Sequence, residues 1–292
     1  MLSLKFLIIA GLILLVAIWA CQRHIDNTDS PFAKIPQSFP VNISIVEASG
    51  IASSKINPGH LWVQEDSGAP SQILLLKNDG TFIKSIYIHG ATNNDWEDMA
   101  LSKGPNSSLD YLYLADFGDN DLTRNDYVIY RFAEPVINVD TIKSYDKIMF
   151  QYPDGSHNAE AIFVDNHSND IYIITKSDNP SRIYKLPFPH HTNSVNTAIS
   201  IGQLGLSGVT GAAISQDGKE IIIKTYPAVS YYLKSPGQSI EQCLMKKPLT
   251  LSYQVEPQGE AIAFASDNSG FYTLSERGIN PVVNLFFYKR TN

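Results

Sequence analysis

From about residue 38 onward, short apolar runs alternate with turns rich in Gly, Asn, Asp and Pro, and helical periodicity is almost absent. Such runs, enriched in β-branched and aromatic side chains, are typical of β-strands. Five segments follow one plan, in which a strand of small and apolar residues precedes a strongly apolar strand and an aromatic-rich strand. The first strands are SGIAS from Ser49, WEDMAL from Trp96, AEAIFV from Ala159, TGAAIS from Thr210 and GEAIAF from Gly259. This internal repetition predicts an architecture built from five similar units.

The two ends of the chain complement each other. A fourth apolar run follows four of the repeats, whereas the last repeat ends at LFFYKRTN without one, and a spare strand, SFPVNISIV, precedes the first repeat. Pairing the spare strand with LFFYK completes the fifth sheet and protects its open edge, as in closed β-propellers. We therefore predict an all-β, five-bladed β-propeller with four-stranded blades over residues 38–292, closed by an N-terminal strand. A six-bladed propeller and an irregular sandwich are the alternatives.

One polar position recurs in the first strands. Aligning them places in one column Ser49, Glu97, Glu160, Thr210 and Glu260. Because the first strand of each propeller blade lines the central channel, these side chains should converge on the axis. Three carboxylates at close range require a cation, or else take up protons. Calcium accepts about six to eight oxygens, magnesium requires near-octahedral geometry, and zinc prefers nitrogen and sulfur ligands. We predict a calcium ion bound by these five residues, with a water-filled, metal-free channel as the alternative.

The order Ser, Glu, Glu, Thr, Glu at one point of five inner strands resembles the calcium-activated nucleotidases (apyrases), which are secreted five-bladed propellers with a calcium ion in the central tunnel. The resemblance concerns the architecture and the ring, over residues 38–290, and it implies calcium ligands at the same five positions. The turns EDSGAP and ADFGDND also resemble the NDSG- and GDxGDN-like turns of uncharacterised bacterial propeller lipoproteins. Loosely similar propellers carry phytase-like and esterase-like labels, which are associations with a fold and define no site.

The N-terminus suggests export. MLSLK precedes the apolar stretch FLIIAGLILLVAIWA and Cys21, so residues 1–20 are predicted to be a signal peptide. The sequence IWAC resembles a bacterial lipobox, which implies lipid on Cys21; an uncleaved anchor is the alternative. Residues 21–37, with Pro31 and Pro36, are predicted to be a flexible tether. The propeller would then be lipid-anchored in a bacterial cell envelope and face the periplasm or the exterior.

Composition limits the classes of partner and of fold that suit this chain. The formal net charge of −7 argues against nucleic acid, which requires a basic surface. The 292 residues are 43% hydrophobic, which is enough to bury the core of one large domain, predicted to be monomeric. With only two cysteines, Cys21 and Cys243, the chain is not a disulfide scaffold, and Cys243 is predicted to be a small core residue or an inert thiol.

The turns between second and third strands lie on the face where the inner strands begin. Their charged members are Glu65, Asp66, Asp116, Asp119, Asp121, Lys176, Asp178, Lys224, Glu276 and Arg277. The cations Lys176, Lys224 and Arg277 each follow an apolar strand at this rim, and beside a bound metal they would hold a phosphate or carboxylate group. For Asp66, Asp119 and Asn120, capping of their own turns is the alternative.

Three hypotheses for function follow. The favoured one is a membrane-tethered, calcium-containing propeller that binds an anionic small molecule or a protein partner at the channel face. The second is a calcium-dependent phosphate-ester hydrolase, in which Glu97 or Asp98 orients water and the three rim cations balance the developing charge. The third is a purely structural envelope protein. The chain contains no G-x-S-x-G elbow, HExxH motif or P-loop, so sequence leaves open whether it is an enzyme.

Overall fold

The computed structural model describes residues 30–41, 45–278 and 282–291, and the compact unit within it begins at Phe32. The predicted signal peptide and Cys21 lie outside the described residues. In the described part of the chain, no helix is both long and apolar enough to cross a bilayer.

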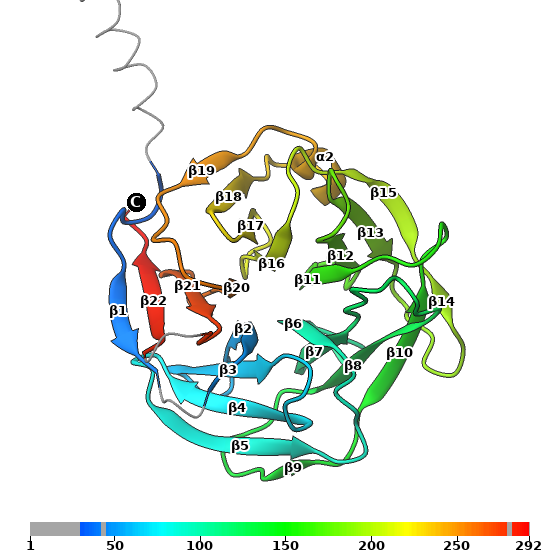
Figure 1. The fold of residues 1–292 in the computed structure, drawn as a ribbon, viewed down its shortest axis with the longest axis horizontal. Helices are drawn as coiled ribbons and strands as arrows, with labels where there is room; N and C mark the ends of the chain where they lie inside the picture. The colour runs from blue at the N-terminus through cyan, green and yellow to red at the C-terminus, as the bar shows by residue number, and fades with distance from the viewer. Residues whose placement is uncertain (1–29, 42–44, 279–281, 292) are drawn as a thin grey trace, which may run out of the picture. The chain divides into compact units, whose positions relative to one another are not determined.

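Five sheets surround a central axis, which confirms the predicted five-bladed propeller (Figure 1). Blade 1 consists of β2 (Ala48–Ser53), β3 (His60–Glu65), β4 (Gln72–Lys77) and β5 (Phe82–Ile88), and blade 2 of β6 (Trp96–Lys103), β7 (Asp110–Asp116), β8 (Tyr127–Ala133) and β10 (Asp146–Gln151). Blade 3 consists of β11 (Ala159–Val164), β12 (Ile171–Thr175), β13 (Arg182–Leu186) and β15 (Ile199–Gln203), and blade 4 of β16 (Val209–Ile214), β17 (Glu220–Thr225), β18 (Ala228–Leu233) and β19 (Leu249–Leu251). Blade 5 consists of β20 (Gly259–Phe264), β21 (Gly270–Ser275), β22 (Asn284–Lys289) and β1 (Gln37–Pro40).

Two details extend the prediction of four-stranded blades. A fifth, two-residue strand pairs in parallel with the outer edge of blade 1, as β9 (Thr141–Ile142), and of blade 2, as β14 (Asn196–Thr197). Each belongs to the connection between the third and fourth strands of the next blade, and it covers an edge that would otherwise expose unpaired backbone groups. The short helix α2 (Ile240–Leu244), which we did not predict, lies between β18 and β19 and begins with a capping box formed by Ser239 and Gln242.

The ring closes as expected, through antiparallel pairing of β1 with β22 from Gln37 opposite Phe287 to Pro40 opposite Asn284. The pairing strand is shorter than predicted. The packed part of the chain also begins before residue 38. Phe32, within the segment predicted as a tether, is only 2% exposed. Its ring lies edge-on to Phe271, with centroids 4.9 Å apart. Closure therefore combines backbone pairing with an aromatic anchor that precedes it.

The core consists of five hydrophobic clusters, one at each interface between neighbouring blades. Strand β3 shows why its sequence is continuously apolar, because Leu61 and Val63 pack toward blade 5 while Trp62 packs toward blade 2. Successive side chains of a strand point to opposite faces, and both faces of a propeller blade are covered. Cys243 is buried in the cluster between blades 3 and 4, in agreement with a core residue.

Candidate metal centre in the channel

Each inner strand carries an irregularity at the predicted column. The pairing of β2 with β3 passes from Ala48 to Gly50, so that Ser49 has no partner in the ladder. Equivalent shifts leave out Glu160, Thr210 and Glu260 in blades 3, 4 and 5, and both Glu97 and Asp98 in blade 2. A β-bulge re-aims a side chain out of the regular alternation. Five bulges at one level of the propeller thus provide the local reason why these residues leave the sheets and meet.

The three glutamates of the column meet. Glu97, Glu160 and Glu260 are all buried, and each contributes one carboxylate oxygen to a group within 4.8 Å. A calcium ion, with bonds of about 2.3–2.6 Å, can contact oxygens at that separation. The Ser49 hydroxyl donates to Glu260 Oε2 at 3.3 Å, and the Thr210 hydroxyl donates to the carbonyl of Gly259 at 3.2 Å. We call Glu97, Glu160 and Glu260 the ring group; their role as metal ligands stays a prediction.

Lys176 supplies one positive charge to the ring group. Its ammonium forms an ion pair with Glu160, lies 3.6 Å from Glu260 Oε1, and donates to the Tyr226 hydroxyl at 3.0 Å. Tyr226 in turn donates to Glu260 Oε1 at 2.7 Å. Burial alone would lower the pKa of Lys176, but the adjacent Glu160 carboxylate holds that pKa above its ordinary value. This lysine, predicted at the rim, is therefore charged and points into the channel.

Glu97 differs from the other two glutamates. Its side chain is 3% exposed, yet within the described residues its carboxylate accepts no hydrogen bond and forms no ion pair. Burial, followed by the nearby Glu160 carboxylate, raises the pKa of Glu97 well above its ordinary value. A buried carboxylate normally has hydrogen-bonding or charged partners, because burying an unpaired charge is costly. Glu97 is therefore the strongest indication that a cation belongs here.

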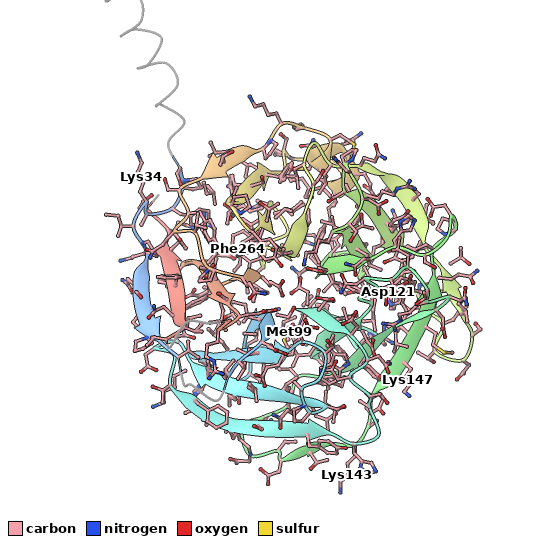
Figure 2. All side chains as sticks on the ribbon, viewed as in Figure 1. Lys34, Met99, Asp121, Lys143, Lys147 and Phe264 are labelled. Atoms are coloured by element: carbon pink, nitrogen blue, oxygen red, sulfur yellow. The ribbon has the colours of Figure 1, made fainter. Side chains whose placement is uncertain are left out.

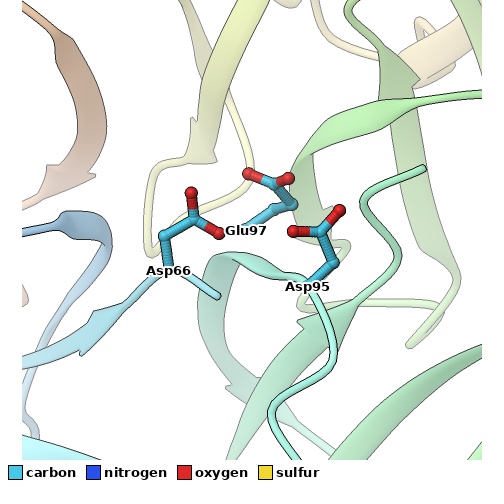
Figure 3. A group of neighbouring side chains, drawn as sticks. All are labelled: Asp66, Asp95 and Glu97. Carbon is cyan, nitrogen blue, oxygen red and sulfur yellow. The ribbon is translucent and has the colours of Figure 1, made fainter. Parts of the chain in front are cut away.

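A second acidic group adjoins the ring. One oxygen each from Asp66, Asp95 and Glu97 lies within 4.8 Å of the others, and Figure 3 shows the three carboxylates turned toward one another. We call these residues the outer group; Asp66 and Asp95 are half-buried. A methyl group on Gly118 would lie 2.3 Å from both Asp95 Oδ2 and Glu97 Oε1, so the close approach of that loop requires glycine.

Neighbouring loops hold the outer group in place. The Asn93 side chain donates to the carbonyl of Asp66 at 2.7 Å, which ties the loop after β3 to the loop before β6. The backbone N–H of Asp95 donates to Asp116 Oδ1 at 3.3 Å, and Arg124 pairs with the same oxygen at 3.0 Å. Burial raises the pKa of Asp66 to about 6 and raises the pKa of Asp95 as well. Asp95 was not predicted as a site residue; its position two residues before the aligned Glu97 was the available signal.

Asp98 closes the channel beneath the ring group. Its carboxylate accepts the N–H groups of Met99 at 2.8 Å, of Ile162 at 3.0 Å and of Ala212 at 3.3 Å, which belong to blades 2, 3 and 4. Burial raises its pKa well above the ordinary value. Beyond it, residues of all five inner strands, including Met99 (Figure 2), line a small, partly open pocket of about 30 Å³. Asp98 is fully buried, and its carboxylate is occupied by backbone contacts to three blades.

The other predicted rim cations have different surroundings. The Lys224 side chain is fully buried and donates to the Gly259 carbonyl and to the Tyr253 hydroxyl, both at 2.6 Å, with Glu256 at 3.5 Å. Burial lowers its pKa. Lys224 thus fastens blade 4 to blade 5 and does not face solvent. Arg277 is half-buried, and its backbone N–H donates to the Val46 carbonyl at 2.7 Å.

Two other acids of the rim, Asp119 and Glu276, differ in their surroundings. Asp119 accepts the backbone N–H groups of Thr123 and Arg124 at 2.8 and 3.0 Å, which is the capping role considered for it. Glu276 instead lies near the ring group, since burial and the Glu260 carboxylate raise its pKa to about 8. The protonated form of Glu276 is thereby favoured beside the Glu260 carboxylate.

Comparison with known proteins identifies no family, since no family model and no curated protein matches the chain. Among solved structures, the hydrazine synthase of Kuenenia stuttgartiensis has a TM-score of 0.42 at 10% identity over 81% of this chain and 70% of that one. A chain of a nidogen/laminin complex has a TM-score of 0.46 at 11% identity over 80% and 74%. Similarity at this level carries no functional argument, so the interpretation of the site depends on its geometry alone.

Proposed function

We propose that the channel binds a calcium ion in the ring group and that the surrounding face binds an anionic ligand. The observation that supports this proposal is the buried Glu97 carboxylate, which has no hydrogen-bond or ion-pair partner among the described residues and belongs to both acidic groups. The available donors are carboxylate and hydroxyl oxygens, which suit hard cations. Their five-fold arrangement favours calcium over magnesium because calcium tolerates irregular coordination. The resemblance to calcium-activated nucleotidases supports the same choice of ion.

An anion is the ligand class that such a centre would hold. Asp98 is buried on one side of the ring group, so a bound cation would keep its open coordination positions on the other side, near the half-buried Asp66 and Asp95. A phosphate or carboxylate group can complete the coordination of a hard cation from that side. Lys176, already at the ring, would add a second positive charge to the ligand.

Few of the candidate catalytic residues are free to act on a substrate, which favours a binding function over hydrolysis. Of the five catalytic candidates, Asp98 and Lys224 are held in buried structural contacts. A hydrolase would therefore depend on Glu97, Lys176 and Arg277 alone, with Glu97 also needed for the metal. A binding module needs only the cation and a polar rim.

Calcium is expected to raise the melting temperature of the full-length protein in detergent by about 5–10 °C over its value in EDTA. An ion at about 100 times its dissociation constant stabilises by about 2.7 kcal/mol, which for a domain of this size shifts the melting temperature by a few degrees per kcal/mol. Glu97→Gln should abolish the shift, whereas Asp121→Asn, a change of the same kind at an exposed position labelled in Figure 2, should retain it. Inorganic phosphate should add stability only when calcium is present. Equal melting temperatures in EDTA, calcium, magnesium and manganese would contradict the proposal.

We also propose that the propeller is anchored in a bacterial envelope through lipid on Cys21, because the N-terminal sequence resembles a lipobox. Expression with radiolabelled palmitate in a bacterial host should label the wild type and leave Cys21→Ala unlabelled. Equal labelling of the two proteins, or labelling of neither, would refute the lipid anchor and support an uncleaved segment.

A further inference from the structure

The outer group lacks any positive partner. Lys176 forms ion pairs with Glu160 and Glu260, and Arg124 forms one with Asp116. In the described part of the chain, no ion pair reaches Asp66, Asp95 or Glu97, although their oxygens lie within 4.8 Å of one another. Like charges at this spacing repel strongly in a partly desolvated site. A calcium ion in the ring group leaves Asp66 and Asp95 uncompensated on its solvent side.

Glu97 belongs to both groups. Its Oε1 faces Asp95 across the space that a Cβ on Gly118 would fill, and one of its oxygens also lies within 4.8 Å of Glu160 and Glu260. The side chain is almost fully buried and has no hydrogen bond among the described residues, so both oxygens are available to a metal. Carboxylates commonly bridge paired cations, which lie about 3.5–4 Å apart in two-metal sites.

We propose that the outer group binds a second divalent cation, calcium or manganese, which shares Glu97 with the ion of the ring group. This inference rests on the proposed function, because it places the second ion beside the first. The formal charges agree with two ions. Five ionised carboxylates and the Lys176 ammonium sum to −4, which two divalent cations neutralise and one does not. Since Asp66 and Asp95 are half-buried, the second ion is open to water and to the anionic ligand, which would bridge the pair.

The experiment is to count calcium ions bound to the full-length protein in detergent by equilibrium dialysis with radioactive calcium. The wild type is expected to bind two ions per chain. Asp95→Asn should bind one, Glu160→Gln should bind one, and Glu97→Gln should show at least a tenfold loss at both positions. Asp121→Asn, exposed on the same loop as Gly118, should bind two.

The outcomes separate the two proposals. One ion that is lost in Glu160→Gln and retained in Asp95→Asn would overturn the second position and leave the ring site intact. One ion with the opposite dependence would overturn the pair and place the cation in the outer group. No bound ion would overturn both proposals. Asp95→Asn should melt in EDTA no lower than the wild type, because it removes repulsion, and this shows that a lost ion is not a lost fold.

Manganese provides a second readout that does not depend on affinity. Two Mn²⁺ ions that share the Glu97 carboxylate should give the electron paramagnetic resonance spectrum of an exchange-coupled pair. Asp95→Asn should instead give the spectrum of an isolated ion. An isolated-ion spectrum for the wild type at saturation would overturn the shared carboxylate.

Discussion

Without divalent cations, the protein is expected to lose about 2–4 kcal/mol of unfolding free energy from its channel carboxyls as pH rises from about 5 to 8. Burial raises the pKa of Glu160 from 4.5 to about 7, of Asp66 from 3.8 to about 6 and of Glu276 from 4.5 to about 8. In that interval the folded state holds protons that the unfolded chain has released, so stability falls as pH rises. Glu160 alone corresponds to about 3 kcal/mol at 1.36 kcal/mol per pKa unit, and the partly exposed Asp66 and Glu276 add less.

Calcium should remove this loss, because the cation replaces the protons. The quantity to measure is the difference in unfolding free energy between calcium and EDTA, obtained by urea denaturation at several pH values. It should grow from pH 5 to 8. Burial lowers the pKa of His190 to about 4, so the stability that its neutral form contributes is lost as pH falls from about 6.5 to 4. This contribution is the same in calcium and in EDTA, so it cancels in the difference. Glu160→Gln should flatten the pH dependence. A difference that stays constant or shrinks toward pH 8 would contradict this account of the channel.

Asp98→Ala is expected to lower the free energy of unfolding by about 3–6 kcal/mol. The substitution leaves the N–H groups of Met99, Ile162 and Ala212 without an acceptor at a fully buried position. Each unsatisfied buried donor costs about 1–3 kcal/mol. Asp98→Asn keeps an acceptor oxygen and should cost less than half as much. Urea denaturation measures both values.

The same pair of variants tests what Asp98 does. Because its carboxylate is engaged with three blades, Asp98→Asn should bind as many calcium ions as the wild type. A normal unfolding free energy for Asp98→Ala would show that the amides find other partners. Loss of calcium from a folded Asp98→Asn would instead make this residue a ligand.

The fold and the ring group could be predicted from sequence because both arise from a pattern that repeats in each blade. Blades covered on two faces require continuous apolar strands such as β3, and the missing strand at one end matches the spare strand at the other. The column of Ser49 and the three glutamates followed from alignment of the inner strands. Its physical basis, a bulge at the same level of every blade, is a local property that each repeat carries in its own residues.

The surroundings of the ring were decided by tertiary structure, since they depend on loops and on contacts between blades. Lys176 directly follows β12 and Lys224 lies near the end of β17, yet Lys176 points to the glutamates and Lys224 into a buried contact with blade 5. Blade 2 skips two residues where the other blades skip one, which turns Asp98 across the axis and frees Glu97. Gly118 leaves open the space beside the Asp95 and Glu97 carboxylates, which a larger residue would fill. Such contacts have no sequence period, because they are made between residues distant in the chain, and only the folded ring brings them together.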